Sequence, residues 1–148
     1  MFIREQRFPI STGPLVAIAK AGLLAKGWSA TGMTIRPERP AGTTADPLTR
    51  RMVSIRDDSG PVVGRIQSRR QGVNVWADSA VDAENICLDL MSIFEACPDG
   101  NPITATRGFS GPYKVPADNP LTVIVSTVPK PLTNFYFAFI ADVKASAA

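Results

Sequence analysis

The segment of residues 51–111 constrains the fold most strongly, because its pattern changes from extended to helical and back to extended. Residues 51–56 alternate apolar with polar side chains, which is the two-residue period of a half-buried strand. The Asp-Asp-Ser-Gly-Pro run at 57–61 favours a turn, and residues 63–76 form a second extended run. We therefore expect a β-hairpin, with a bulge or kink at Gly72.

A helix is predicted directly after this hairpin. Asp78 or Ser79 can cap its N-terminus by accepting backbone hydrogen bonds. Asp82 and Glu84 place negative charge where the helix dipole favours it, and the Pro-Asp-Gly of 98–100 ends the helix. The apolar positions recur at three and four residues and form one buried stripe: Ala83, Ile86, Cys87, Leu90, Met91, Phe94 and Cys97.

The remaining extended runs complete a sheet. An alternating strand is predicted at 103–109, ending at the Ser-Gly-Pro of 110–112. Residues 33–36 and 121–128 are two further strand candidates. In the last run, 135–143, both faces are apolar, which is typical of a central strand or of one covered by a partner.

A second helix is predicted near the N-terminus, at residues 14–26. Thr12 can cap it, Pro14 suits its first turn, and Gly27 suits the position after its end. Its apolar side chains lie nearly all the way round. Such a helix is buried on more than one face, which in so small a domain indicates an oligomer.

Together these elements predict an α+β fold, with a mostly antiparallel sheet of four to five strands packed by two helices. A chain of 148 residues is expected to form a single domain, 1–148. We expect an N-terminal arm at 1–12, an extended basic loop at 36–50, a second loop at 112–120 and a short tail at 144–148.

The cysteines and the hydropathy pattern indicate a folding compartment. Cys87 and Cys97 lie ten residues apart on one predicted helix, roughly 15 Å along its axis and beyond disulfide reach. We expect two reduced thiols and assembly in the cytoplasm. The apolar run 15–25 is shorter than the roughly 20 residues of a membrane span, and the N-terminus lacks a signal-peptide layout. We therefore expect no membrane association.

The composition argues against an enzyme. The chain contains no histidine, which removes the usual general base, the imidazole-assisted nucleophiles and imidazole metal ligands. No glycine-rich phosphate loop is present. Asp57 and Asp58 could bind a cation, but the Ser-Gly-Pro that follows them indicates a turn instead. We expect no catalytic residues, no metal site and no cofactor.

Charge is distributed unevenly along the chain. Residues 1–70 hold twelve Lys/Arg and five Asp/Glu, whereas residues 71–148 hold four and eight. This asymmetry suits contacts between copies of the chain, the basic half suits contact with phosphates, and a merely solvated surface would look the same. All three interpretations stay open at this point.

Four arginines are expected along one edge of the sheet, at Arg56, Arg65, Arg69 and Arg70. Neither predicted helix is basic, and the aromatic residues are not interleaved with arginine, which disfavours reading of bases or stacking on single strands. Two roles remain for these arginines: non-specific contact with a DNA backbone, or salt bridges to acidic neighbours.

Four motifs resemble a known family. They are R-x-V-x-I-R-D-D-x-G-P at 51–61, G-V-N-V-W-A at 72–77, S-G-P-Y-x-V-P at 110–116 and the aromatic closing strand at 135–143. In this order, with a helix and a basic Pro-rich loop before them, they resemble the tail terminator proteins of long-tailed (siphovirus) phages. The chain is most similar to those of phages that infect actinobacteria. The insertion at 121–133 departs from the family pattern and leaves the pairing of that strand open.

The resemblance implies a structural virion protein of the tail neck, assembled in the host cytoplasm. Such subunits form a hexameric ring that caps the tail tube, ends its polymerisation and joins the tail to the head connector. The implied partners are other copies of the chain, the tail tube protein, the connector proteins and DNA in the lumen. The residues expected at an interface or in the lumen are Arg36, Arg39, Arg50, Arg51, Arg65, Arg69, Arg70, Tyr113 and Lys114.

Two alternatives remain at the level of sequence. The first is another ring-forming component of the head–tail neck, such as a connector or head-completion protein. The second is a small cytoplasmic nucleic-acid-binding protein, which steeply salt-dependent retention of DNA would reveal.

Overall fold

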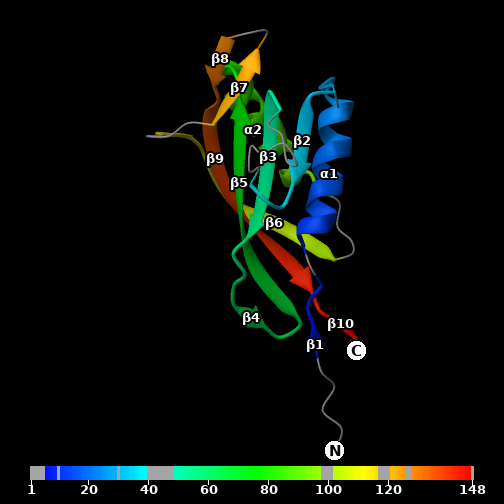
Figure 1. Ribbon diagram of the computed structural model, residues 1–148. Coiled ribbons are helices and arrows are strands. Elements are labelled where there is room, and N and C mark those ends of the chain that lie inside the picture. The colour runs from blue at the N-terminus through cyan, green and yellow to red at the C-terminus, as the bar shows by residue number, and fades with distance from the viewer. Residues whose placement is uncertain are drawn as a thin grey trace, which may run out of the picture.

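The chain folds as an α+β unit with two helices on one face of a mostly antiparallel sheet, as the sequence predicts (Figure 1). This computed structural model describes residues 6–9, 11–29, 31–39, 49–97, 102–116, 121–125 and 128–147. The predicted loop segment 40–48 lies outside the described residues, as do 1–5 and 148 of the predicted arm and tail.

The main sheet has six strands. Its neighbours run in the order β2-β3-β5-β9-β6, and β4 pairs additionally with β5. β2 and β3 are parallel, and every other pair in this sheet is antiparallel. The strands are β2 (Met33–Arg36), β3 (Arg51–Asp57), β4 (Val62–Val63), β5 (Ile66–Ala77), β6 (Ile103–Val115) and β9 (Thr133–Lys144).

The helices are α1 (Thr12–Ala25) and α2 (Ala80–Glu95). Two small sheets lie outside the main one. β7 (Thr122–Val125) pairs with β8 (Val128–Pro131), and β1 (Gln6–Arg7) pairs with β10 (Ser146–Ala147), all antiparallel. The β7–β8 hairpin lies at one end of the molecule, and β1 and β10 lie at the other (Figure 1).

Strands β5 and β9 form the centre of the sheet, and their pairing is continuous from Ile66↔Lys144 to Ala77↔Thr133. Because side chains alternate across a strand, this register divides the residues of both strands between two faces. One face is apolar and lies under the helices: Val53, Ile55, Val73, Val75, Phe135, Phe137 and Phe139. The other face carries no helix.

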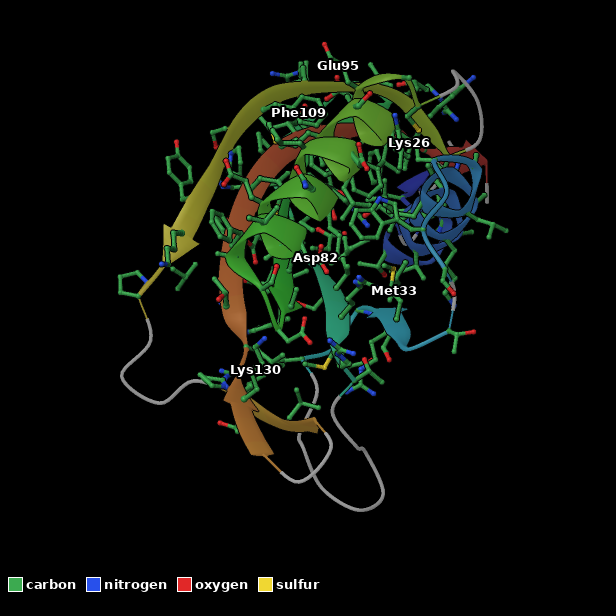
Figure 2. The ribbon with its side chains drawn as sticks, turned by 90° about the horizontal axis from the view of Figure 1, so that it is seen from above. Lys26, Met33, Asp82, Glu95, Phe109 and Lys130 are labelled. Atoms are coloured by element: carbon green, nitrogen blue, oxygen red, sulfur yellow. The ribbon has the colours of Figure 1, made fainter. Side chains whose placement is uncertain are left out.

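Helix α2 packs on the aromatic row of β9. Ser79 caps it by accepting a hydrogen bond from the Asp82 amide at 3.1 Å, and this confirms the predicted cap. Phe94 and Phe109 each stack on Phe139 with ring centroids 5.0 Å apart. Strands β6 and β9 curve around the helix (Figure 2), so that α2 is covered on more than one side.

Helix α1 buries one face rather than the two that its composition predicted. Leu15, Ala19 and Leu23 are buried, whereas Leu24 stays 64% exposed. Ser11, not the predicted Thr12, occupies the N-cap position, and its side chain makes no capping hydrogen bond. Gly27 follows the helix with φ of +93°, as the sequence predicted.

Three predictions about the strands were wrong. Strand β6 does not end at 110–112 but continues to Val115, because an edge strand tolerates proline. Gly111, with φ of +115°, lets it pass β9 closely, since a Cβ there would lie 2.8 Å from the Tyr136 carbonyl oxygen. As a result, Tyr113 and Lys114 lie on a strand and not in the predicted loop at 112–120.

The second error concerns Gly72, and the third concerns the strand predicted at 121–128. Gly72 pairs in unbroken register with Arg56 and Ala138, so there is no bulge at this position. The glycine instead leaves room for the Tyr136 side chain, because a Cβ at position 72 would lie 3.1 Å from Tyr136 Oη. Thr122–Val125 and Val128–Pro131 pair as two strands, where the sequence predicted one strand at 121–128. The main sheet has six strands rather than the predicted four to five, because the two-residue β4 also pairs with β5.

The core predicts a contrast between two leucines of α2. Leu90 is fully buried and Leu88 is 47% exposed. Replacing Leu90 by Ala should lower the free energy of unfolding by about 2–5 kcal/mol, because it removes packed methyl groups and leaves a cavity. Leu88→Ala should change it by less than about 0.5 kcal/mol. Urea unfolding followed by circular dichroism measures both, and equal effects would contradict the orientation of α2.

Candidate functional site

Carboxylates and thiols are the side chains of this chain that could bind a metal or act as nucleophiles. Among the described residues, no three carboxylates or thiols gather as metal ligands. Both cysteines are free. Burial, with a smaller contribution from Glu84, raises the pKa of the Cys87 thiol to about 12, and burial also raises the pKa of Cys97. Both shifts suppress the reactive thiolate.

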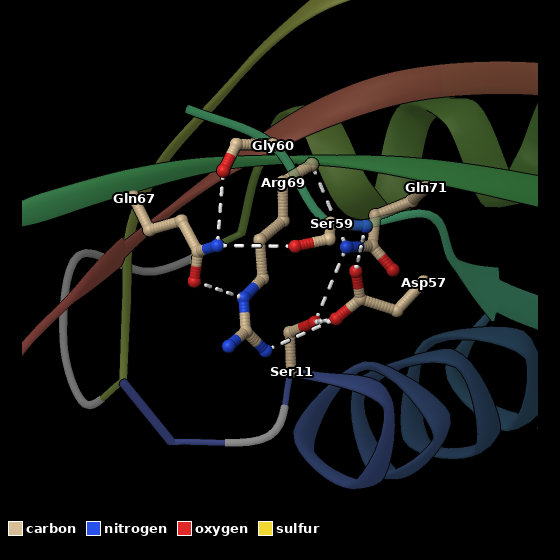
Figure 3. Close-up of polar contacts among 7 residues, drawn as sticks. All are labelled: Ser11, Asp57, Ser59, Gly60, Gln67, Arg69 and Gln71. Atoms are coloured by element: carbon tan, nitrogen blue, oxygen red, sulfur yellow. Dashed lines mark hydrogen bonds and ion pairs between the residues drawn. The ribbon is translucent and has the colours of Figure 1, made fainter. Parts of the chain in front are cut away.

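A partly buried polar network joins the start of α1 to the β3–β5 hairpin (Figure 3). Asp57 is its centre, because it accepts hydrogen bonds from Ser11 Oγ at 2.7 Å, the Ser59 amide at 2.7 Å and Arg69 Nη1 at 3.1 Å. Arg69 Nε donates to Gln67 Oε1 at 2.7 Å. The carboxylate accepts three hydrogen bonds from donors of its own chain, which indicates a structural role.

Arg69 and Arg70 do not form the basic cluster that the sequence predicted. Arg69 lies on the helix-covered side, where its side chain is 14% exposed and paired with Asp57. Arg70 lies on the opposite face, is exposed, and forms no side-chain hydrogen bond or ion pair within the described part of the chain. The prediction that both face a lumen or a neighbour is therefore wrong for Arg69, because adjacent residues of a strand point to opposite faces.

Arg50 and Arg51 are also used within the chain. Arg50 forms an ion pair with Asp78, and Arg51 pairs with Asp82 at 2.7 Å. The Arg51 guanidinium also lies 5.2 Å from the Trp28 ring centre. These pairs join the basic half of the sequence to the acidic half, so part of the charge asymmetry is neutralised inside one subunit.

The other predicted basic residues are dispersed. Arg36 ends β2, and its Nε donates to the Glu38 carbonyl oxygen at 3.2 Å. Arg65 is exposed beside the β4–β5 turn and donates to the Ala145 carbonyl oxygen at 3.2 Å. Arg39 lies over Trp76, 5.9 Å from the ring centre. No single basic surface brings these three together.

A groove of about 340 Å³ lies on the face of the sheet that the helices do not cover. Ser54, Asn74 and Asn134 line its floor from three adjacent strands, and Arg39 and Arg56 supply positive charge. The buried Oδ1 of Asn134 has no hydrogen-bond partner. Such a groove can accept a polar segment of a partner, but it offers no acid–base pair for catalysis.

The apolar end of this groove is formed by the β7–β8 hairpin region. Leu132 packs there with Met52 and Trp76 of the sheet. Sequence reasoning missed the groove, although the signal was present: Ser54, Asn74 and Asn134 occupy alternate, polar positions of their strands. Their convergence depends on the cross-strand register, which the sequence does not state.

The two ends of the sheet are unpaired edges of different kinds. Among the described strands, β2, four residues long, pairs only with β3, and β6, thirteen residues long, pairs only with β9. Tyr113, which is 56% exposed, and the exposed Lys114 lie on β6. An unpaired edge is a template for another strand, so these edges are the surfaces of this subunit best suited to backbone pairing.

Neither helix in the described part of the chain is both long and apolar enough to cross a membrane. Comparison of the chain with protein-family models finds no match, and comparison with curated proteins finds no significant match.

The polar network predicts a contrast between two neighbouring aspartates. Asp57→Ala should lower the free energy of unfolding by about 1–3 kcal/mol, because it removes the acceptor of the buried Ser11 hydroxyl and of the largely buried Arg69 guanidinium. Asp58→Ala removes only the exposed pair with Arg56 and should cost less than about 1 kcal/mol. Thermal or urea unfolding measures both, and a smaller loss in Asp57→Ala than in Asp58→Ala would contradict the network.

The raised thiol pKa values predict slow labelling. At pH 8, Cys97 should react with a disulfide reagent before Cys87, which should react only when the protein unfolds. In the Cys97→Ser variant, native and urea-unfolded protein should therefore label at very different rates. The pKa of the Cys87 thiol is lower in the unfolded chain than in the folded protein, where burial raises it to about 12. The stability contributed by burying the neutral thiol is therefore fully present below the pKa of the unfolded chain, and it is lost as the pH rises toward 12. Equal labelling rates would contradict the buried position.

Proposed function

We propose that this protein is a structural virion subunit that forms a ring in the tail neck of a long-tailed phage, in the role of a tail terminator. The ring would be hexameric, would be assembled in the host cytoplasm, and would bind the tail tube protein on one side and the head connector on the other. The resemblance of the motifs at 51–61, 72–77 and 110–116 to those of tail terminator proteins supports this proposal.

The observation that carries the proposal is the pair of unlike sheet edges. A closed ring needs a heterologous contact, in which one patch of each subunit meets a different patch of the next. β2 and β6 are two different unpaired edges of one sheet, and joining β6 of one copy to β2 of the next would use both. Tyr113 and Lys114 would then lie at the subunit boundary.

The exposed arginines divide between two roles in such a ring. Arg70 and Arg65 are exposed and are available to DNA in the lumen or to acidic neighbours. Arg69 is not available for this role, because it is held by Asp57. A variant of Arg69 would therefore report on folding and not on assembly.

The proposal predicts a mass and a binding partner. Native mass spectrometry of the purified protein, with and without tail tubes, should find a ring of six copies, either free or only on tube ends. Tyr113→Ala should keep the fold and reduce ring formation on tubes at least about tenfold, because exposed tyrosines at interfaces often carry much of the binding energy. Lys130→Ala, at an exposed position of β8, is the matched control.

The opposing outcome is equally specific. A protein that ignores tubes but is retained on DNA, with steep dependence on salt, would replace the ring proposal by the nucleic-acid alternative.

A further inference from the structure

The groove on the open face of the sheet contains polar side chains that folding leaves without partners. Ser54, Asn74 and Asn134 line its floor, and none of the three forms a side-chain hydrogen bond with any described residue. Ser54 is only 5% exposed, and Oδ1 of Asn134 is buried. A buried polar group without a hydrogen bond is costly, so a bound partner that completes these groups would explain their presence.

The groove also carries positive charge that is not neutralised. Its described lining includes Arg39 and Arg56 and no carboxylate. Arg56 is paired with Asp58 at 2.7 Å, whereas Arg39 is exposed and forms neither an ion pair nor a hydrogen bond within the described part of the chain. The Arg39 guanidinium lies over the Trp76 ring, 5.9 Å from its centre, which leaves its N–H groups free for a carboxylate. A complementary ligand is therefore anionic.

Two of the floor side chains are spaced like alternate peptide groups of an extended chain. Ser54 lies opposite Asn74 across β3 and β5. Asn134 lies diagonally from Asn74, because Asn74 pairs with Tyr136 of β9. Diagonal neighbours on one face of a sheet are roughly 7–8 Å apart, and two residues of an extended chain span about 6.8 Å. A carboxamide both donates and accepts, so each asparagine can bind the N–H and C=O groups of a peptide.

The groove is poorly suited to a nucleic acid. Single strands are bound by aromatic rings on which bases stack and by several cations along the backbone. Trp76, the only aromatic residue in the described lining, is 5% exposed and lies under Arg39, so that no base can stack on it. By contrast, Val115, Pro116 and Leu121 form an apolar wall that is at least partly exposed, and this wall suits an apolar side chain of a peptide.

We propose that this groove binds an extended peptide segment of a partner protein, and that the segment carries a carboxylate side chain. The carboxylate pairs with Arg39, and the backbone of the segment binds Asn74 and Asn134. The site goes beyond the ring proposal and does not rest on it, because the groove lies on the face of the sheet whereas the ring uses the two edges.

The test measures the binding of three labelled pools of hexapeptides, blocked at both ends, to the full chain by fluorescence anisotropy. One internal position is fixed as Asp, Asn or Lys, and the other five are equal mixtures of Ala, Leu and Ser, so that the pools differ only in that side chain. The Asp pool should bind at least about tenfold more tightly than the other two, because only a carboxylate pairs with the Arg39 guanidinium.

Variants separate the two kinds of contact. Arg39→Gln should bring the Asp pool to within about twofold of the Asn pool. Asn134→Ala should instead weaken both pools by the same factor, about fivefold, because it removes a contact with the backbone. Since Oδ1 of Asn134 has no partner among the described residues, this variant should keep the melting temperature of the unaltered protein. Arg70→Gln, which removes an exposed guanidinium on the same face outside the groove, is the matched control and should bind normally.

Each alternative result has a definite meaning. Equal binding of the three pools, or binding of none, would overturn the peptide site. Equal losses in Arg39→Gln and Arg70→Gln would also overturn it, because they would indicate diffuse attraction to the whole face. If N-acetyl-aspartate competes as well as the Asp pool, the groove binds a free carboxylate instead. A labelled single-stranded oligonucleotide that binds more tightly than the Asp pool, and loses this in Arg39→Gln, would assign the groove to nucleic acid.

The ring proposal is judged separately. A six-copy ring that binds no pool would contradict the peptide site and leave the ring in place. A chain that binds the Asp pool but never forms rings would support the peptide site and contradict the ring.

Discussion

The continuous pairing of β5 with β9 is the constraint on which the rest of the structure depends. Its register runs without interruption from Ile66↔Lys144 to Ala77↔Thr133, and it fixes which side chains share a face. A shift by one residue would move the phenylalanines of β9 to the uncovered face and the asparagines under the helices. Because Phe137 and Phe139 contact Phe94 of α2, the register and the helix packing stabilise each other.

This one-sided burial also determines which surfaces are left for partners. Helices cover one face, so the opposite face keeps polar side chains and a groove, and the terminal strands β2 and β6 keep unpaired backbone groups. The helices in turn have an outer surface with no further layer above it. These are the surfaces on which the contacts of the proposed ring would form.

The sequence predicts those features whose signal is local. Helix α2 combines a capping serine with a regular apolar stripe, and both were found where predicted. Gly111 and Pro112 were read as the end of a strand, because their chemistry is that of a turn. In the structure they lie within β6, where the positive φ of Gly111 and the close approach of the β9 backbone explain the glycine. The opposite directions of Arg69 and Arg70 follow from the strand period, but the pairing of Arg69 with Asp57 depends on the register between β3 and β5.

The difference between local signals and contacts set by the fold also explains why net charge is a poor guide to interfaces in this protein. Arg50, Arg51 and Arg69 contribute to the basic half of the sequence, yet each is paired with a carboxylate of its own chain. Charges satisfied in this way offer little to a partner, since recruiting them would first leave a carboxylate unpaired. The charges available for assembly are those that folding leaves without a partner. These include Arg70 on the open face of the sheet, Lys20 on α1 and Glu95 on α2, all of which are exposed.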